Sequence, residues 1–209
     1  MARMLYISLI AVGVFLTPLC NGCGPNYPEL NPALSKYQNG TKCLPIPEKW
    51  YIVYRNYEND PLFGGKAECG KFSSLGPEED GAFPMKLQFK HWSMKVLSTP
   101  KPSEGYDVDN TQYFHVVGKK GSMMVYIAYD DCTTCLVFRN PYVSENACTL
   151  LQPESGLGNT PMCCQFIFDL LCGTGQKYYT YDEETCSKKH IKWWPWWFRK
   201  HIPETNTRP

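Results

Sequence analysis

From Trp50 onward, the chain alternates short runs of strand-favouring residues with clusters of turn residues. Valine, isoleucine, tyrosine and phenylalanine are concentrated in the runs, while glycine, proline, asparagine and aspartate separate them. This pattern is typical of short antiparallel strands joined by turns. It predicts eight strands, at residues 50–57, 67–74, 84–91, 93–98, 106–117, 122–130, 134–139 and 147–152. Strands at this spacing predict an all-β fold, either a barrel or a sandwich.

One helix is predicted after the strands, from Pro161 to Cys172. Thr160 precedes it as the expected N-cap, and Gly173 follows its end, where glycine is common. Helical spacing (i, i+3, i+4, i+7, i+8) relates its apolar residues, which are Cys163, Phe166, Ile167, Leu170 and Leu171. That face is predicted to lie against the sheet. Strands followed by one helix favour a barrel with the helix packed outside.

The N-terminus carries a signal-peptide pattern: Arg3, an apolar run from Leu5 to Leu16, and then small residues. The run is shorter than the roughly 20 residues that span a bilayer. We therefore predict a signal peptide at residues 1–22 and a secreted, extracellular mature chain. Of the 11 cysteines only Cys20 lies in the signal, so ten remain, an even number that predicts disulfides.

Charge divides the mature chain into two parts, although the formal net charge is only +1. Residues 23–186, the predicted barrel domain, are acidic, whereas residues 187–209 form a basic tail. This distribution excludes a chain that binds nucleic acid over its whole surface. The tail combines indoles with cations: Trp193, Trp194, Trp196, Trp197, Arg199 and Lys200. It predicts contact with an anionic membrane or polyanion, and the alternative is that the indoles dock on the barrel.

No residue pattern in the chain predicts catalysis. Cys132-x-x-Cys135 has redox spacing, but Asp130 and Asp131 beside it raise a thiol pKa instead of lowering it. The four histidines have no metal-ligand spacing, and oxidised cysteines leave no thiolate for zinc. We therefore expect no enzyme, no cofactor and no metal. The segment before Trp50 is rich in Pro, Asn and Gly and carries one proline-free acceptor sequon, which predicts glycosylation at Asn39.

Several stretches between residues 48 and 186 form a set by their order and spacing: Lys49-Trp50-Tyr51-Ile52-Val53, Tyr57-Glu58-Asn59-Asp60-Pro61, Glu68-Cys69, Ile127-Ala128-Tyr129-Asp130, Cys135, Cys148, Pro161 to Cys172, and Cys186. Together these stretches resemble the tick salivary lipocalins of the histamine-binding family. The resemblance implies an eight-stranded antiparallel barrel, disulfide cross-linked, with a C-terminal helix packed outside and a small ligand inside. Glu48 replaces the glycine that most lipocalins carry two positions before the tryptophan.

The resemblance also orders the cysteines. It implies four pairs: Cys69 with Cys186, Cys135 with Cys164, Cys43 with Cys163, and Cys148 with Cys172. Cys23 and Cys132 are then left, either to pair with each other or to mark an error in this scheme. The adjacent Cys163 and Cys164 leave exchanges between these pairs open.

Amine binders of the family carry acidic or aromatic residues where this chain has Val125, Leu136, Thr149 and Leu151. A buried ammonium without a carboxylate is costly, so the replacements favour an apolar or amphipathic ligand over an amine. The predicted lining of the barrel is Trp50, Tyr54, Phe89, Met123, Val125, Ile127, Val137 and Leu150. Polar anchors are expected among Tyr54, Arg55 and Tyr113.

The predicted function is therefore sequestration of a small host mediator in the barrel of a monomeric salivary lipocalin, with leukotrienes and fatty acids favoured, to suppress host defence. Two alternatives stay open: a biogenic amine such as histamine as the ligand, and a host protein or membrane bound by the surface or the tail. A further alternative is that the predicted lining residues simply fill a closed core.

Overall fold

A computed structural model of the chain describes residues 25–187. The predicted signal peptide, Cys23 and the tail beyond Ser187 lie outside the described residues. Within residues 25–187, no helix has the length and apolar character that crossing a membrane requires.

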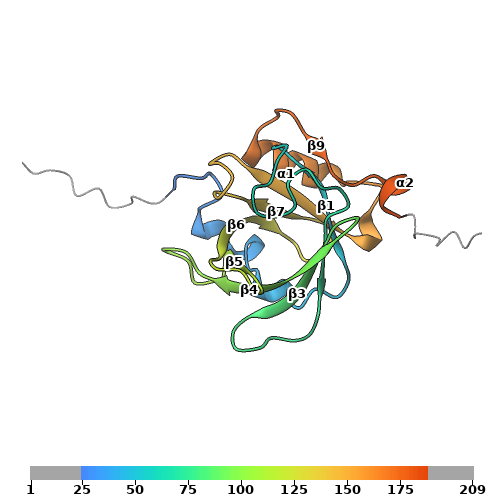
Figure 1. Cartoon of the computed structure of the whole chain (residues 1–209). Helices are drawn as coiled ribbons and strands as arrows, with labels where there is room; N and C mark the ends of the chain where they lie inside the picture. The colour runs from blue at the N-terminus through green and yellow to red at the C-terminus, as the bar shows by residue number, and fades with distance from the viewer. Residues whose placement is uncertain (1–24, 188–209) are drawn as a thin grey trace, which may run out of the picture.

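Eight antiparallel strands close into a barrel (Figure 1). They are β1 (Trp50–Arg55), β2 (Lys71–Ser74), β3 (Phe83–Gln88), β4 (Ser93–Lys101), β5 (Thr111–Val116), β6 (Met123–Asp130), β7 (Leu136–Arg139) and β8 (Cys148–Pro153). Each strand from β2 to β8 pairs with the next, β8 returns to β1, and β1 also pairs with β2. The predicted number, order and barrel closure are confirmed.

Two strands begin later than their sequence pattern predicts. Cys69 has φ 61°, a left-handed conformation that interrupts an extended strand, so β2 begins at Lys71. Asn110 forms a local turn by donating from its backbone to Val108, so β5 begins at Thr111. Propensity alone does not locate such turns.

Several short elements complete the structure. The lead-in contains the 3₁₀ helices η1 (Pro32–Tyr37) and η2 (Thr41–Cys43), and η3 (Glu154–Gly156) follows β8. After helix α1 (Met162–Cys172) come a two-residue strand, β9 (Tyr178–Tyr179), and the short helix α2 (Glu183–Cys186). β9 adds a ninth strand to the sheet because it pairs with the last two residues of β1, an addition that the sequence pattern does not show.

Buried apolar residues form two clusters on opposite faces of the sheet. The inner cluster fills the barrel and includes Trp50, Phe72, Leu87, Phe114, Ile127 and Phe138. The outer cluster lies between the sheet and α1 and includes Val53, Tyr54, Val137, Leu150, Cys164 and Phe168. The barrel is therefore covered by the helix on one side, as predicted.

Helix α1 presents part of the predicted face to the barrel: Ile167 and Leu171 pack against the outer cluster, but the centre of the buried face lies elsewhere. Cys164, Phe168 and Cys172 are its buried residues, whereas Phe166 and Leu170 are each 66% exposed. The helix is apolar on almost all sides, so periodicity could not select between faces. The N-cap also differs: Pro161 occupies that position, and the Thr160 hydroxyl donates to Gln152 instead.

Four disulfides link the described cysteines. The structure pairs Cys69 with Cys186, Cys135 with Cys164, and Cys148 with Cys172, as the resemblance implies. The predicted pair of Cys43 with Cys163 is wrong: Cys43 bonds Cys132, and Cys163 is an exposed free cysteine. The path of the lead-in brings Cys43 to the turn between β6 and β7, where Cys132 is its partner.

The lead-in is held on the barrel by a buried ion pair. Arg139 of β7 donates to both carboxylate oxygens of Glu29, at 2.7 and 2.9 Å. The two side chains are 2% and 0% exposed. Arg139 also donates to the carbonyl of Leu171 in the last turn of α1 and lies over the ring of Tyr27. One guanidinium thus joins the lead-in, the sheet and the helix.

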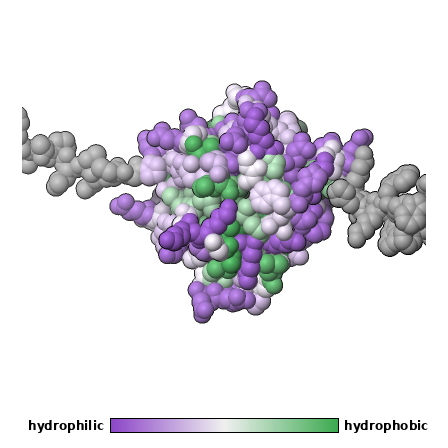
Figure 2. Space-filling model, viewed as in Figure 1, coloured by the Kyte–Doolittle hydropathy of each residue, from purple (hydrophilic) through white to green (hydrophobic). Residues whose placement is uncertain are grey.

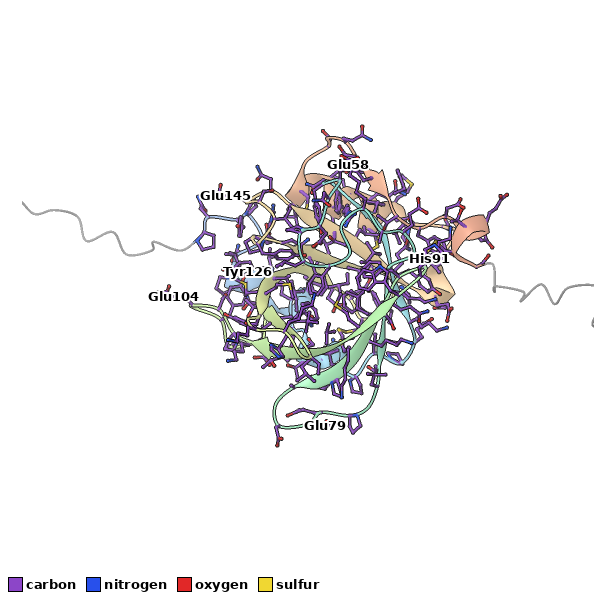
Figure 3. All side chains as sticks on the ribbon, in the orientation of Figure 1. Glu58, Glu79, His91, Glu104, Tyr126 and Glu145 are labelled. Atoms are coloured by element: carbon purple, nitrogen blue, oxygen red, sulfur yellow. A yellow bond between two sulfur atoms is a disulfide. The ribbon has the colours of Figure 1, made fainter. Side chains whose placement is uncertain are left out.

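The surface is mainly polar. Figure 2 shows hydrophilic residues around the periphery of one face and a band of hydrophobic residues across its middle. Glu58, Glu79, Glu104 and Glu145 all lie at the periphery (Figure 3). These four carboxylates are exposed, whereas Glu29, Asp60 and Asp130 are buried.

Candidate ligand site inside the barrel

A β-bulge in β1 turns Arg55 into the barrel. The pairing of β1 with β8 shifts register between Ile52 and Tyr54. Strict alternation from Trp50 would direct Tyr54 inward, but the extra residue reverses the pattern, as bulges do. Tyr54 therefore belongs to the outer cluster, where its ring centroid lies 4.8 Å from that of Phe168.

A second bulge, in β6, does the same for Asp130. The pairing of β6 with β7 shifts register between Ile127 and Tyr129, which sends Ala128 to the outer cluster. Tyr129 then stacks on Tyr37 of the lead-in, and Asp130 lines the barrel interior. Two bulges thus supply two inward polar side chains, Arg55 and Asp130, and neither bulge leaves a signal in the sequence.

The predicted inward faces of β7 and β8 are wrong by one residue. Val137 and Leu150 pair across the two strands and lie in the outer cluster. The inward pair beside them is Phe138 with Thr149. Because side chains alternate, a shift of one residue exchanges lining for covering.

The other predicted lining residues lie in the inner cluster: Trp50, Phe89, Met123, Val125 and Ile127. Leu136, Thr149 and Leu151 also line the interior, and so the positions at which amine binders of the family carry acids or aromatics do face the barrel. Tyr113 is not among the residues that line either inner cavity. Its ring lies beneath the Nζ of Lys101.

The first inner cavity, which we call the Asp130 cavity, measures about 30 Å³. Its wall includes Trp50, Met85, Gln112, Asp130 and Leu136, and the lead-in covers it with Gly40, Cys43, Leu44 and Ile46. Gly40 is required by this cover, because a Cβ there would lie 2.5 Å from Cδ1 of Ile127. The N-terminal segment therefore closes this end of the barrel.

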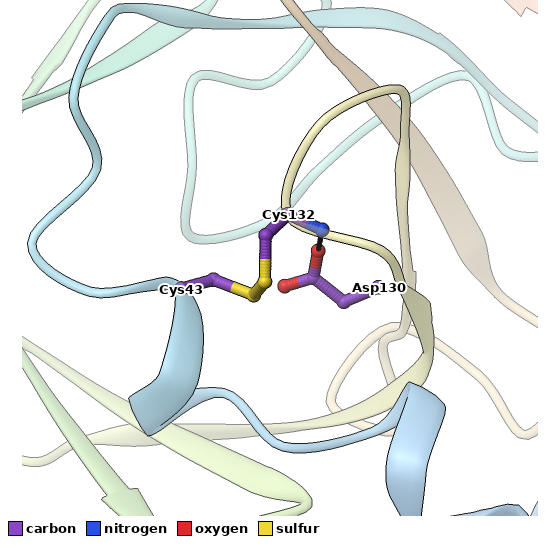
Figure 4. Close-up of side chains that lie close together, drawn as sticks. All are labelled: Cys43, Asp130 and Cys132. Atoms are coloured by element: carbon purple, nitrogen blue, oxygen red, sulfur yellow. Dashed lines mark hydrogen bonds between the residues drawn. A yellow bond between two sulfur atoms is a disulfide. The ribbon is translucent and has the colours of Figure 1, made fainter.

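Asp130 is 7% exposed and has no ion-pair partner among the described residues. One of its oxygens accepts a hydrogen bond from the backbone N–H of Cys132 at 2.7 Å (Figure 4). Burial raises the pKa of this carboxyl to about 7, since the hydrogen bond from Cys132 and the charge of Lys42 compensate only part of the desolvation and of the repulsion by Asp131. No residue within 25–187 donates a hydrogen bond to the second oxygen, which leaves it available to a ligand.

The second inner cavity, the Arg55 cavity, also measures about 30 Å³. Its polar wall consists of Arg55, Tyr57, Asp60, Asn140, Tyr142 and Thr149. Both cavities share Phe72, Phe114, Phe138 and Leu151, which stand between them. The interior is thus an apolar middle with polar side chains at each end, among them Asp130 at one and Arg55 at the other.

Arg55 is 4% exposed and only partly hydrogen-bonded. Its Nη2 donates to the carbonyls of Glu58 and Gly65, at 2.9 and 2.6 Å. Its Nε is buried and has no hydrogen-bond partner within residues 25–187. An unpaired buried donor costs about 1–3 kcal/mol, so this nitrogen favours a ligand that brings an acceptor.

Asp60, in contrast, is fully engaged. One oxygen accepts from the backbone N–H groups of Leu62 and Phe63, and the other accepts from the hydroxyls of Tyr57 and Tyr142. Burial and the Asp60 charge raise the pKa of Tyr57, so its hydroxyl stays protonated. This carboxylate has no oxygen left for an ammonium.

One cluster of metal-ligand types exists among the described residues: Cys43, Asp130 and Cys132. The two sulfur atoms are bonded to each other (Figure 4), so no thiolate is present to ligate a cation. The donor set does not fit a metal ion.

A closed eight-stranded antiparallel barrel with an external helix and a lined interior defines a ligand-binding lipocalin. The chain belongs to the tick histamine-binding protein family, whose profile, described as "Tick histamine binding protein", matches residues 28–188. No curated protein matches the chain.

Solved structures similar to the chain are distant. A serotonin complex of AM182 has TM-score 0.47 and 15% identity and covers 79% of this chain and 96% of its own. Japanin from Rhipicephalus appendiculatus bound to cholesterol has TM-score 0.48 and 14% identity, with coverages of 66% and 94%. A point mutant of LTBP1 in complex with leukotriene C4 has TM-score 0.44 and 14% identity, with coverages of 71% and 93%.

Proposed function

We propose that this chain is a secreted salivary lipocalin that sequesters a small amphipathic host mediator in its barrel and catalyses no reaction. The ligand's apolar body lies among Phe72, Phe114 and Phe138, and its acceptor head, a carboxylate or hydroxyl, bonds Nε of Arg55. The observation that carries the proposal is this buried, unpartnered donor at the end of an aromatic interior. Fatty acids and leukotrienes have this chemistry.

The two inner cavities are too small to hold a lipid as they stand. Two spaces of about 30 Å³ hold little more than ordered water. A lipid must therefore part the aromatic side chains that separate the Asp130 cavity from the Arg55 cavity. Phe114 contacts Phe138 edge-on, with ring centroids 6.0 Å apart, and contacts Phe72 at an interplanar angle of 30°. A ligand replaces those ring contacts with its own.

Calorimetric titration of the wild-type chain with a saturated fatty acid, leukotriene C4, cholesterol, histamine and serotonin tests the proposal. Arg55→Met retains an apolar stem and removes the donor. We expect it to weaken carboxylate binding about 10- to 100-fold, because a hydrogen bond to a charged group contributes roughly 1.5–3 kcal/mol. Asp130→Asn, at the opposite end, is the matched control and should retain affinity. If no member of the panel binds, the interior is a closed core and the proposal is wrong.

A biogenic amine is the second candidate, and Asp130 specifically favours it. A carboxylate with a raised pKa and one free oxygen gains most from an ammonium partner. Only one free carboxylate is available at that end within the described chain, and so we rank an amine below an acceptor-headed ligand. Tight histamine or serotonin binding that is lost in Asp130→Asn and retained in Arg55→Met would reverse this ranking.

Two further proposals concern the outer surface. Asn39 is half-buried, and its side-chain oxygen accepts from the backbone of Lys42; we propose that its amide nitrogen carries a glycan. The basic tail is proposed to contact anionic membranes or polyanions, through the tryptophans at 193, 194, 196 and 197 and the cations at 199 and 200. A monomer is the proposed state of the secreted chain.

A further inference from the structure

One side of the barrel carries lysines and no carboxylate. Strands β2, β3 and β4 together contain four lysines, and none of their residues is an aspartate or a glutamate. This is unexpected in a barrel domain that is acidic as a whole. A surface whose charges all have one sign attracts partners of the opposite sign. Three of these lysines, Lys71, Lys86 and Lys95, form what we call the lysine row.

Strand pairing brings the lysine row together on the outer face of the sheet. Lys86 lies directly opposite Lys95 in the pairing of β3 with β4, two strands that lie side by side in Figure 1. Ser73 lies opposite Lys86 in the pairing of β2 with β3, and Lys71 is two residues from Ser73 on the same face. The residues next to the lysines in sequence belong to the inner cluster: Phe72, Leu87 and Val96. The lysines therefore point outward and cross three strands, over about 10 Å.

The lysine row is electrostatically unfavourable within this chain. Like charges directly opposite each other in neighbouring strands destabilise a sheet. No carboxylate within residues 25–187 forms an ion pair with any of the three lysines. Burial lowers the pKa of Lys71, and the charges of Lys49 and Lys86 lower it further, although Glu154 opposes them. An anion bound between these cations would relieve their repulsion.

The carboxylate that acts on Lys71 is already engaged by other groups. Glu154 accepts hydrogen bonds from Nζ of Lys49 and from the hydroxyl of Tyr51, each at 3.0 Å. Lys71 donates to the hydroxyl of Tyr51 at 3.3 Å. Because an ammonium carries three donors, Lys71 keeps donors for a ligand.

The row continues toward the turn between β5 and β6. The backbone N–H of Val117 donates to the carbonyl of Lys95 at 3.0 Å, and Lys119 and Lys120 follow in an exposed turn. Neither of these two lysines forms an ion pair with another described residue. They lengthen the positive surface in the direction across the strands.

Carboxylates lie off the row, in the turn of the β2–β3 hairpin. Glu79 and Asp80 are exposed there, and Glu79 lies at the periphery in Figure 3. β3 begins at Phe83, so Lys86 is about 10 Å along the strand from this turn. That distance exceeds the Debye length of about 8 Å at physiological salt. A narrow linear polyanion can follow the row without approaching these acids, whereas a flat anionic bilayer on the same face would meet them.

The side chains beside the lysines favour a polysaccharide over a nucleic acid. Ser73, Gln88 and Ser93 share the outer face with the row and can bond sugar hydroxyls. Single-stranded nucleic acids are usually held by exposed aromatic rings on which the bases stack. None of the outward residues of β2, β3 and β4 is aromatic.

We propose that the lysine row binds a sulfated glycosaminoglycan chain. The ammonium groups of Lys71, Lys86 and Lys95 pair with sulfate groups, and the neighbouring hydroxyl and amide side chains bond the sugars. The row lies on the outer face of the barrel, so the polysaccharide and a ligand inside the barrel can be bound at the same time. This site is separate from the basic tail.

Calorimetric titration of the full chain with a heparin oligosaccharide, at several NaCl concentrations, tests the proposal. Lys86→Gln/Lys95→Gln should weaken binding roughly 10-fold and reduce the dependence of affinity on salt, because fewer counterions are displaced. Its unfolding midpoint should stay equal or rise, since a repulsion is removed. Lys36→Gln/Lys66→Gln, which removes the same charge elsewhere, is the matched control and should retain affinity. Both variants keep the tail, so its contribution cancels.

Four outcomes overturn the proposal. Equal losses in the two double variants would show that affinity follows net charge. Unchanged affinity in Lys86→Gln/Lys95→Gln would assign heparin to another part of the chain. Equal binding of chemically desulfated heparin would remove the role of sulfate. Binding of phosphatidylserine vesicles or of poly(U) without binding of heparin would identify a partner of another class. Each result leaves the proposed ligand of the barrel untouched, because none of these probes is titrated into the cavity.

Discussion

At the scale of the residue, the barrel interior contains two buried polar side chains of opposite charge type, and each lacks a partner for one of its polar atoms within the described residues. Arg55 has a donor without an acceptor, and Asp130 has a carboxylate without a cation. The apolar middle keeps them apart, because each lines a different cavity. The two side chains therefore do not pair with each other, and each can pair with a polar group of a ligand.

Asp130 should make the stability of the chain depend on pH. Its pKa is about 7 in the folded state and near 3.8 when unfolded, so the folded state holds the proton more strongly. Stability from this group is fully present below pH 4 and is lost as the pH rises to about 7, by up to ~4 kcal/mol. Asp130→Asn should abolish this loss in urea titrations across pH 4–8.

The neighbouring Asp131 provides a control of opposite sign. Burial opposes its ionisation, but hydrogen bonds from Thr134, Thr133 and Cys135 outweigh burial and lower its pKa. Its stabilising effect is present above the unfolded pKa and is lost as the pH falls. Asp131→Asn should therefore destabilise the chain above pH 5, and equal pH profiles for the two variants would contradict both assignments.

At the scale of the element, the lead-in belongs to the site although it precedes the first strand. It covers the Asp130 cavity and is held by Cys43–Cys132 and by the Glu29–Arg139 pair. Gln38, fully buried, reinforces it by donating to the carbonyl of Glu29. A segment rich in proline and asparagine thus behaves as part of the core.

Glu29→Gln should test how strongly the lead-in is fixed. The substitution leaves the buried Arg139 charge without its partner, which typically costs about 3–5 kcal/mol. Chemical denaturation measures this loss. Glu58→Gln is the control, because it breaks an exposed pair with Lys66, for which less than about 1 kcal/mol is expected. Equal losses would show that the buried pair does not hold the segment.

The elements were predictable to the extent that their patterns were local. Short apolar runs located eight strands, and Pro161 and Gly173 located the ends of α1, because each signal depends on neighbouring residues. The inward faces were not predictable throughout, since the bulges at Val53 and Ala128 depend on how two strands pair. Alternation therefore directs Tyr54 inward and gives no sign that Asp130 lines the barrel. The buried face of α1 is predictable only in part, at Ile167 and Leu171, because apolar residues surround that helix.

At the scale of the whole molecule, the barrel and the tail should be separable. Cys69–Cys186 ends the described covalent framework one residue before Ser187. A chain truncated after Ser187 should retain its circular dichroism spectrum and unfolding midpoint, because every described core contact is kept. Sedimentation with phosphatidylserine vesicles should decrease on truncation, and if both forms sediment equally, the tail is not the membrane contact.

The two bulges have a consequence for how such barrels diversify. Insertion or loss of a single codon within a strand exchanges the inward and outward residues beyond that point, while the opposite strand and the external helix keep their places. One such insertion or deletion would replace an apolar cavity lining by a charged one, and no substitution of a lining residue would be needed. Ligand preference would then change in one mutational event, and aligned sequences would record it as a gap.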